Sequence, residues 1–419
     1  MEIIAVFIFA IGYLAIAFEH PLKLNKTATA LVTGVLVWVV IAILQGHTGT
    51  EKLSHHLASS AEILFFLLGA MTIVELVDAH QGFRMISKLI QTENPVKLLW
   101  ISAIATFLLS ALLDNLTTSI IMITLLRKLI AEKETRWFYG GIIVIAANAG
   151  GAWSPIGDVT TTMLWIGGQV SALNIMKILF LPSIISLIVP LLLISSKVKK
   201  MALGGSSLEL EQSSKELKEG NIMLWAGSLS LIGVPIFKTL THLPPYMGIL
   251  LALGIVWIIS EILHAEKDEE NKKPLTVAHA LSKIDTSSIL FFLGILLAIG
   301  ALESLGYLEQ LAQLLQSSVG NQNIIVLLIG IVSSIVDNVP LVAATMGMYS
   351  LTDFPTDHSL WEFIAFCAGT GGSLLIIGSA AGVAVMGMEQ ISFGWYLKKI
   401  SLIALLGYVA GAVTYLILS

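Results

Sequence analysis

Charged residues are scarce in this sequence. Asp, Glu, Lys and Arg together make up 12% of its 419 residues, whereas an average soluble protein contains about 25%. Hydrophobic residues make up 56%, and the mean hydropathy is +0.88. This composition excludes an ordinary soluble domain and predicts an all-α polytopic membrane protein whose surroundings are the lipid bilayer.

Other features are also missing. A single cysteine, Cys367, excludes an intramolecular disulfide framework. The net charge of -5 is too small to indicate a strongly acidic or basic partner, and the chain lacks the basic runs with interleaved aromatics that would indicate nucleic-acid binding. The first apolar run starts at Met1 without a basic leader or a small-residue cleavage site, so it is expected to be a membrane span. We expect neither an enzymatic activity nor a resident cofactor.

Long apolar runs dominate what is present. A helix needs about 20 residues to cross a bilayer core of about 30 Å. The runs that approach or reach this length are residues 2–18, 27–45, 61–79, 175–195, 221–240, 245–264, 286–303 and 395–417. Polar linkers at 196–220 and 265–284 separate some of them.

A short polar pattern occurs twice in apolar surroundings. Residues 110–115 and, 223 residues later, residues 333–338 share a serine, three spacers, an aspartate and an asparagine. The serine precedes the aspartate by one helical turn, so the hydroxyl, carboxylate and carboxamide would share one face where a helix ends. Ionisable residues such as Asp114 and Asp337 inside a membrane protein indicate a functional site.

These patterns interrupt stretches whose limbs are too short to cross the membrane with ease. In residues 96–130 the apolar limbs on either side of Asp114 have roughly 14 to 18 residues. Residues 322–352 repeat this arrangement around Asp337. Both stretches are therefore predicted to be re-entrant helical hairpins, with polar tips near the middle of the membrane and buried by protein.

A broken helix is predicted after each hairpin. Residues 137–168 are interrupted at 148–158, where three glycines and a proline would stop a helix. Residues 360–388 are interrupted at 369–373, which is also rich in glycine. We expect an unwound centre between two half-helices in each case.

Nearly constant spacings indicate an internal duplication. Residues 63–67 (Ile-Leu-Phe-Phe-Leu) recur unchanged at 289–293, and the Asp-Asn pairs lie 223 residues apart. The predicted organisation is a first repeat at 1–195, a cytoplasmic linker at 196–220 and a second repeat at 221–419.

The positive-inside rule orients the two repeats oppositely. With both termini outside, most lysines and arginines fall in cytoplasmic linkers. The first hairpin then enters from the cytoplasm and the second from outside, where the flanking segments 303–322 and 351–362 contain no basic residue. Inverted repeats of about five spans each, with discontinuous helices that meet at the midplane, are typical of secondary transporters.

Oxygen-bearing side chains gather at the predicted tips and breaks, which contain no basic residue. Hard cations prefer oxygen ligands, so a small monovalent cation is the expected substrate. Protons should compete with this cation for the same carboxylates, and competition for one alternating-access site produces exchange. The candidate ion-binding residues are Ser110, Asp114, Asn115, Thr117, Asn148, Asp158, Thr160, Thr161, Ser333, Asp337, Asn338, Thr370 and Ser373. The expected ligands of Na⁺ or Li⁺ among them are Asp114, Asn115, Asp337 and Asn338.

The same segments resemble a known family. The two Asp-Asn tips, Asn-Ala-Gly-Gly-Ala-Trp-Ser-Pro-Ile-Gly-Asp-Val-Thr-Thr at 148–161, Phe-Glu-His-Pro at 18–21 and Gly-Thr-Gly-Gly-Ser at 369–373 are similar to NhaD-type sodium/proton antiporters of the ion transporter superfamily. The resemblance covers nearly the whole chain. It implies Na⁺ or Li⁺ efflux against H⁺ entry, a homodimer in the bacterial inner membrane, and an elevator-like movement of the hairpins and broken helices against the other spans.

Two other functions are alternatives. Sodium-coupled dicarboxylate carriers of the same superfamily carry serine where Asp114 and Asp337 stand, and two additional carboxylates would repel an anionic substrate, whether a dicarboxylate or arsenite. An intramembrane aspartyl protease would also use two buried aspartates. However, Pro155 disturbs the glycine motif before Asp158, and a protease needs no symmetric copy.

Each candidate also has a purely structural interpretation. The three aspartates could be helix N-caps. Ser110 and Ser333 could bond the carbonyl four residues earlier, and the candidates at the breaks could satisfy unwound backbone. The three histidines between the second and third runs, at positions 47, 55 and 56, are expected to be solvated in an outer loop.

Overall fold

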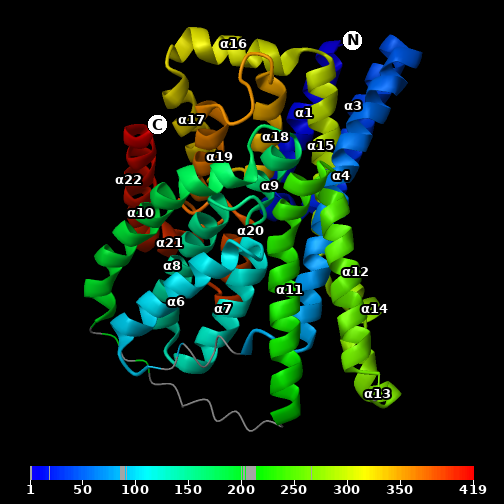
Figure 1. The fold of residues 1–419 in the computed structure, drawn as a ribbon. Coiled ribbons are helices and arrows are strands. Elements are labelled where there is room, and N and C mark those ends of the chain that lie inside the picture. Colours follow the sequence, from blue (N-terminus) through cyan, green and yellow to red (C-terminus); the bar gives the residue numbers. More distant parts are fainter. Residues whose placement is uncertain are drawn as a thin grey trace.

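The computed structural model describes residues 2–17, 19–84, 90, 92–199, 201, 203, 214–265 and 267–419. Phe18 of the family resemblance and most of the central part of the linker 196–220 lie outside the described residues. The described chain is largely helical, as the composition predicts (Figure 1).

The first half of the chain contains the helices α1 (Glu2–Ala17), α2 (Glu19–Leu22), α3 (Lys26–Gln45), α4 (His47–Ala79), α6 (Pro95–Ser110), α7 (Asn115–Leu129), α8 (Lys133–Ala152), α9 (Val159–Ile166) and α10 (Ala172–Val198). The second half contains α11 (Ser214–Thr241), α12 (Pro245–Leu263), α13 (Glu269–Lys272), η1 (Lys273–Leu275), α14 (Val277–Lys283), α15 (Thr286–Ser304), α16 (Tyr307–Val319), α17 (Gln322–Val332), α18 (Asn338–Met348), α19 (Ser359–Gly371), α20 (Ala380–Glu389), α21 (Phe393–Tyr396), η2 (Leu397–Ser401) and α22 (Leu402–Leu418).

Seven helical segments in the described ranges are long and apolar enough to cross a membrane, or eight if α16 and α17, which meet at 113°, count as one span. The segment at the C-terminus joins α21, η2 and α22. The protein is therefore an all-helical multi-pass membrane protein. The predicted first span forms α1, which has 16 residues and falls below this length.

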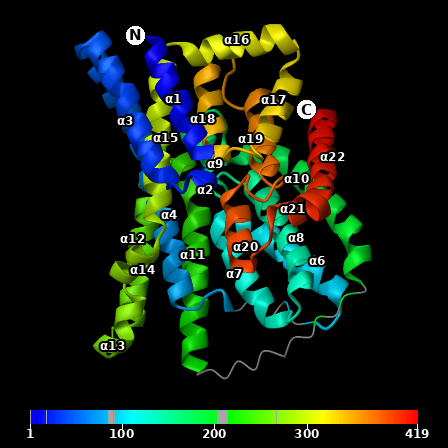
Figure 2. The same cartoon turned by 180° about the vertical axis from the view of Figure 1, so that it is seen from behind.

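The helices form two groups that lie side by side (Figures 1 and 2). The scaffold group contains α1, α3, α4, α11, α12, α14 and α15; within it α3 packs against α1 and α15, and α12 against α4 and α11. The tip group contains α6–α10, α17–α20 and α22; within it α6, α7 and α20 pack against α8, and α17 packs against α19. The groups meet where α18 contacts α15 and α9 contacts α4. Because α10 and α22 pack on each other and on α19, these two spans belong with the tips.

Each predicted hairpin consists of two short helices joined by a turn. In the first, Asn94 caps α6 by accepting a hydrogen bond from the amide of Lys97, and Pro95 occupies the first helical position, where its missing N–H costs nothing. In the second, Asn321 caps α17. The turns that follow α6 and α17 bring both Asp-Asn pairs to the beginnings of α7 and α18.

Both helix breaks begin later in the sequence than predicted. Helix α8 continues through Asn148 to Ala152, so the break covers only 153–158, and α19 continues to Gly371 before a break at 372–379. The glycines allow close packing and do not unwind the helix: a Cβ atom on Gly150 would overlap the carbonyl oxygen of Phe107 in α6. A Cβ atom on Gly371 would overlap the corresponding carbonyl in α17.

Two connections predicted without helices are helical. The prediction of an outer loop containing His47, His55 and His56 was wrong, because α4 begins at His47. The His56 ring is half-buried, and its Nε2 lies 3.0 Å from the Ser304 hydroxyl of α15. Helix α16, which lies across one end of the molecule in Figures 1 and 2, was also missed. Its apolar residues Leu308, Ala312 and Leu315 recur every three to four positions, as expected of a surface helix.

Candidate cation site

The two tips meet at the carboxylate of Asp158, which is 2% exposed. Its Oδ2 atom accepts hydrogen bonds from the Nδ2 atoms of Asn115 at 3.3 Å and Asn338 at 3.4 Å. Its Oδ1 atom accepts one from the amide of Thr160 at 3.2 Å and so caps α9. Predicted residues from both halves of the sequence therefore converge on one buried carboxylate.

A second set of polar side chains extends this centre towards the other break. Asn148 accepts a hydrogen bond from Asn115 Nδ2 at 3.1 Å, and its own Nδ2 donates to the hydroxyls of Ser373 and Ser379, each at 3.0 Å. Ser379 is absent from the predicted residues. It caps α20 just as Asp158 caps α9, and the spacing of 221 residues that relates the glycines of the two breaks would have found it.

At the first tip, the carboxylate of Asp114 is held by its own helix. Oδ1 accepts the amide N–H of Thr117 at 2.7 Å, and Oδ2 accepts the Thr117 hydroxyl at 2.6 Å. Asp114 is therefore a complete N-cap of α7. Thr117, a predicted ion ligand, directs its hydroxyl to this cap.

At the second tip, Asp337 is bound to another element. It accepts no hydrogen bond from the backbone of α18, whose residues are all described. The position that corresponds to Thr117 is Pro340, which has no N–H to donate. Instead, the Asp337 Oδ2 atom accepts a hydrogen bond from Nζ of Lys26, the first residue of α3, at 3.2 Å.

Lys26 was not predicted near the site. The absence of basic residues holds for the tips and breaks themselves, but this lysine comes from the scaffold group, 311 residues away in sequence. Its ammonium group also lies over the ring of Phe291 in α15, 4.7 Å from the ring centroid. The partly exposed Lys26–Asp337 pair joins the scaffold group to the tip group.

The two predicted serines bind the broken helices. Ser110 donates to the carbonyl of Ala147 in α8 at 2.6 Å, and Ser333 donates to the carbonyl of Ala368 in α19 at 3.0 Å. The structural interpretation, in which each serine bonds the carbonyl four residues earlier in its own helix, is therefore wrong. Each hairpin is thus attached to the following broken helix through the same residue type at corresponding positions.

The remaining candidates differ in how their hydroxyls are used. Thr370 donates to the carbonyl of Phe366 within α19, and Thr161 lies 3.5 Å from the carbonyl of Ala152. The hydroxyl of Thr160 is buried and lies close to the Asp158 carboxylate. It is therefore placed to contact an ion or a water molecule bound at that carboxylate.

The charge of this region favours a cation. Asp158 lies within electrostatic reach of both Asp114 and Asp337. When all three carboxylates are ionised, they and the Lys26 ammonium carry a formal net charge of -2, which favours uptake of a cation or protons. Four helices, α7, α9, α18 and α20, begin here, and the partial positive charge at their N-termini stabilises the carboxylates.

The arrangement differs from a chelating metal centre. Within the described part of the chain, no three His, Cys, Asp or Glu side chains converge closely enough to hold one metal ion together. The ligands that remain are carboxylate, amide and hydroxyl oxygens, which suit a weakly held monovalent cation better than a tightly bound divalent one.

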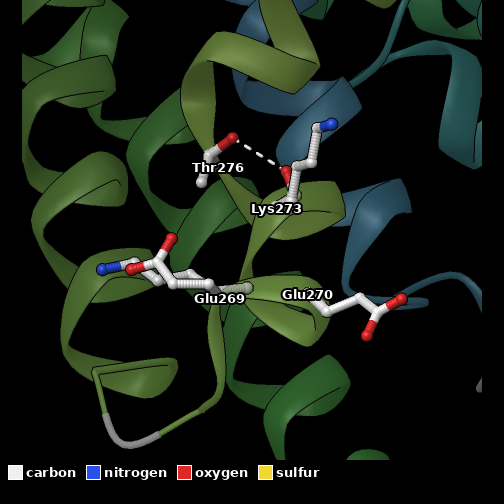
Figure 3. A pocket seen from close by; sticks show the side chains of 5 residues that line it. Glu269, Glu270, Lys273 and Thr276 are labelled. Carbon is white, nitrogen blue, oxygen red and sulfur yellow. Dashed lines mark hydrogen bonds between the residues drawn. The ribbon is translucent and has the colours of Figure 1, made fainter.

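Two features elsewhere are separate from this centre. A depression of about 410 Å³ at the far end of the scaffold group is lined by Glu269, Glu270, Lys272, Lys273 and Thr276. Its mixed charges are typical of a solvated surface, and four of its residues are labelled in Figure 3. A histidine pair follows the ends of α4 and α12: the ring centroids of His80 and His264 lie 6.0 Å apart, and burial lowers the pKa of both.

Known proteins resemble the chain over most of its length. The citrate transporter family matches residues 13–361. Sodium/proton antiporter 1 of Arabidopsis thaliana is 52% identical over 413 residues, 98% of this chain and 71% of that protein, and the Na⁺/H⁺ antiporter NhaD of Vibrio cholerae is 34% identical over 446 residues, 99% and 91% of the two chains. Among solved structures, the YdaH transporter of Alcanivorax borkumensis has the same fold, with a TM-score of 0.62 at 12% identity over 93% of this chain and 97% of that one.

Proposed function

The chain belongs to the NhaD-type sodium/proton antiporters, and we propose that it exchanges Na⁺ or Li⁺ for H⁺ at the centre where both tips meet Asp158. The observation that carries this proposal is the convergence of Asn115 and Asn338, one from each tip, on one buried carboxylate. The name of the matching family suggests citrate as another substrate. Three carboxylates near a single ammonium group would repel a citrate anion, so the local charge favours the cation.

The proposed chemistry is competition for the same oxygen atoms. A cation bound near Asp158 would interact with its carboxylate and with side-chain oxygens beside it, such as the Asn115 carboxamide and the Thr160 hydroxyl. A proton on Asp158 removes the negative charge that attracts the cation, so the two ligands exclude each other. When each form of the site opens to either side of the membrane in turn, the result is exchange.

We further propose that the access change is an elevator-like movement of the tip group against the scaffold group. Matching contacts support an inverted-repeat arrangement. The Ser110 hydroxyl donates a hydrogen bond to α8 as the Ser333 hydroxyl does to α19. Gly150 and Gly371, which have no side chain, allow α6 and α17 to approach their neighbouring helices closely. Contacts within the tip group are extensive, whereas the two groups meet mainly through α15 with α18 and α4 with α9. A unit of this kind can move as one body.

The membrane topology and assembly are part of the same proposal. The distribution of lysines and arginines supports termini on the outer side, with the hairpins entering from opposite faces. The family resemblance supports a homodimer. Relatives from a plant and from bacteria match the chain almost throughout, so the bacterial inner membrane stays a prediction.

Exchange in vesicles tests the function directly. We expect Na⁺ or Li⁺, added to everted vesicles that hold an acidic interior, to dissipate the pH gradient, and K⁺ to have little effect. Asp114→Asn should reduce the response at least tenfold, and labelled citrate should not accumulate. Citrate uptake without Na⁺-dependent proton movement would refute cation exchange and favour the anion carrier.

A further inference from the structure

We propose that Lys26 is an internal competitor of the transported cation: its ammonium group occupies Asp337 when the second tip is empty and must leave this carboxylate when Na⁺ binds. This inference rests on the proposed Na⁺/H⁺ exchange and adds to it a residue from the scaffold group. Lys26 of the scaffold group and Asp337 of the tip group form an ion pair, with 3.2 Å between Nζ and Oδ2.

The second tip leaves its carboxylate free for such a partner. At the first tip, two hydrogen bonds from Thr117 satisfy Asp114, and α7 itself holds the carboxylate in place. At the second tip, Pro340 offers neither an amide N–H nor a hydroxyl at the same position. The Asp337 carboxylate accepts no capping hydrogen bond from its own helix, and a full counter-charge comes from Lys26 or from a cation.

The place of Lys26 is built by the scaffold group. Asn25 caps α3 by accepting the amide N–H of Thr27, so the helix begins with Lys26. The ring of Phe291 in α15 supports the ammonium group from one side, and the charges of Glu19 and Asp285 lie within electrostatic reach. These groups favour an ammonium group at this place beside the second tip.

The pair is suited to exchange because it is only partly buried. The side chains of Lys26 and Asp337 are 31% and 18% exposed, and ion pairs with such access to water are modest in strength. A Na⁺ ion can therefore displace the ammonium group at moderate cost. Displacement of Lys26 would also break a contact between the tip group and the scaffold group. Cation binding would thereby make it easier for the tip group to move against the scaffold group.

A second lysine provides a matched control. Lys238 of α11 also crosses from the scaffold group to the tip group: its Nζ donates to the Trp165 carbonyl of α9 at 2.9 Å and lies 4.9 Å from the centroid of the Trp165 ring. It therefore shares the cation–aromatic contact and the bridging position of Lys26, but its partner is an uncharged oxygen. Glu62 of α4 lies within electrostatic reach of Lys238, but it belongs to the scaffold group and to neither tip. Loss of Lys238 should therefore loosen the interface without freeing a tip carboxylate.

The test compares half-saturating Na⁺ concentrations in the full-length protein reconstituted into liposomes, at about pH 8.5 where ordinary carboxylates are ionised. Lys26→Gln should lower the half-saturating Na⁺ about three- to tenfold, because Na⁺ no longer competes with a tethered charge. Lys26→Arg should stay within about twofold of the wild type, and Lys238→Gln should not increase the affinity. When Asp337 is already replaced by asparagine, Lys26→Gln should not lower the half-saturating Na⁺ concentration, because the carboxylate for which the lysine competes is gone.

Na⁺-dependent thermal stabilisation of the purified protein provides a readout independent of turnover, and its midpoint should shift to lower Na⁺ in Lys26→Gln. An unchanged or higher half-saturating Na⁺ in Lys26→Gln, or an equal gain in Lys238→Gln, would overturn the inference while wild-type exchange still supports the function. Absence of exchange in the wild type would refute the function itself. Lys26→Met, which keeps the apolar stem over Phe291, is the second neutral variant; if neither neutral variant folds, Lys26 is a structural tether and the inference is wrong.

Discussion

The two hairpin tips carry the same Ser-x-x-x-Asp-Asn frame, yet they hold their carboxylates in different ways. Asp114 accepts two hydrogen bonds from Thr117 of its own helix, whereas Asp337 forms an ion pair with Lys26 of α3. The tips differ at the position three residues after each aspartate, which is threonine in the first tip and proline in the second. The asparagines behave alike, since both donate to Asp158. The repeat therefore conserves the contacts that build the centre while one tip has a fixed charge and the other an exchangeable one.

Removal of either tip carboxylate should have the largest effect. Asparagine is a good N-cap, so Asp114→Asn should leave α7 intact but reduce exchange by at least tenfold. Asp337→Asn should reduce it at least as much, because it also leaves the Lys26 ammonium without its partner. Initial rates of Na⁺-driven proton movement, normalised to the amount of folded protein, measure both. Near-normal exchange in either variant would show that its carboxylate does not take part.

Matched glycine substitutions test whether the two tips are attached in the same way. An added methyl group at Gly150 or Gly371 meets the backbone of α6 or α17, so Gly150→Ala and Gly371→Ala should each destabilise the protein by about 1–3 kcal/mol. Thermal unfolding in detergent provides the comparison, with Gly254→Ala, where a Cβ atom meets nothing within 4 Å, as the control. A large loss in one variant alone would contradict equivalent attachment.

The proposed cause of the difference between the tips is tested by exchanging one residue. Pro340→Thr restores an amide N–H and a hydroxyl at the position of Thr117, so Asp337 should cap α18 and gain about 0.5–1 kcal/mol of stability. The carboxylate would then be shared between the helix and Lys26. Half-saturating Na⁺ should consequently depend less on Lys26 than in the wild type. If Lys26→Gln has the same effect in the Pro340→Thr background as in the wild type, the cap does not control the carboxylate.

The smallest expected effect concerns the scaffold histidines and separates them from the tips. Burial lowers the pKa of His80 and His264, while Lys267 and Lys272 disfavour and Glu261 favours protonation of His264. The unfolded chain therefore binds protons at these positions at a higher pH than the folded protein. Their contribution to stability is complete above the ordinary histidine pKa of about 6.5 and is lost as the pH falls below it.

Unfolding temperatures measured between about pH 8 and pH 5 should fall less steeply in the double variant His80→Gln and His264→Gln than in the wild type. In Asp337→Asn, the part of the fall in unfolding temperature with pH that is due to the histidines should remain. An unchanged slope in the histidine variant would assign the acid sensitivity to other groups.

Part of this account could be predicted from the sequence because it depends on local patterns. Apolar length predicts the spans, and the repeated Ser-x-x-x-Asp-Asn frame predicts that Asn115 and Asn338 lie at helix starts, where the structure brings them to Asp158. Other parts depend on contacts distant in sequence. The glycines of α8 do not unwind it, because they are covered by α6, and no local pattern reveals this packing. The contact of Lys26 with Asp337 joins residues that only the complete fold brings together.

Direct Na⁺ binding to the purified protein is the sharpest test of the claim that both halves build one cation site around Asp158. We expect the wild type to bind radiolabelled Na⁺ saturably, with Li⁺ and protons as competitors, and Asp158→Asn to remain folded but to lose this binding. Sodium binding by Asp158→Asn with the affinity of the wild type would contradict the account.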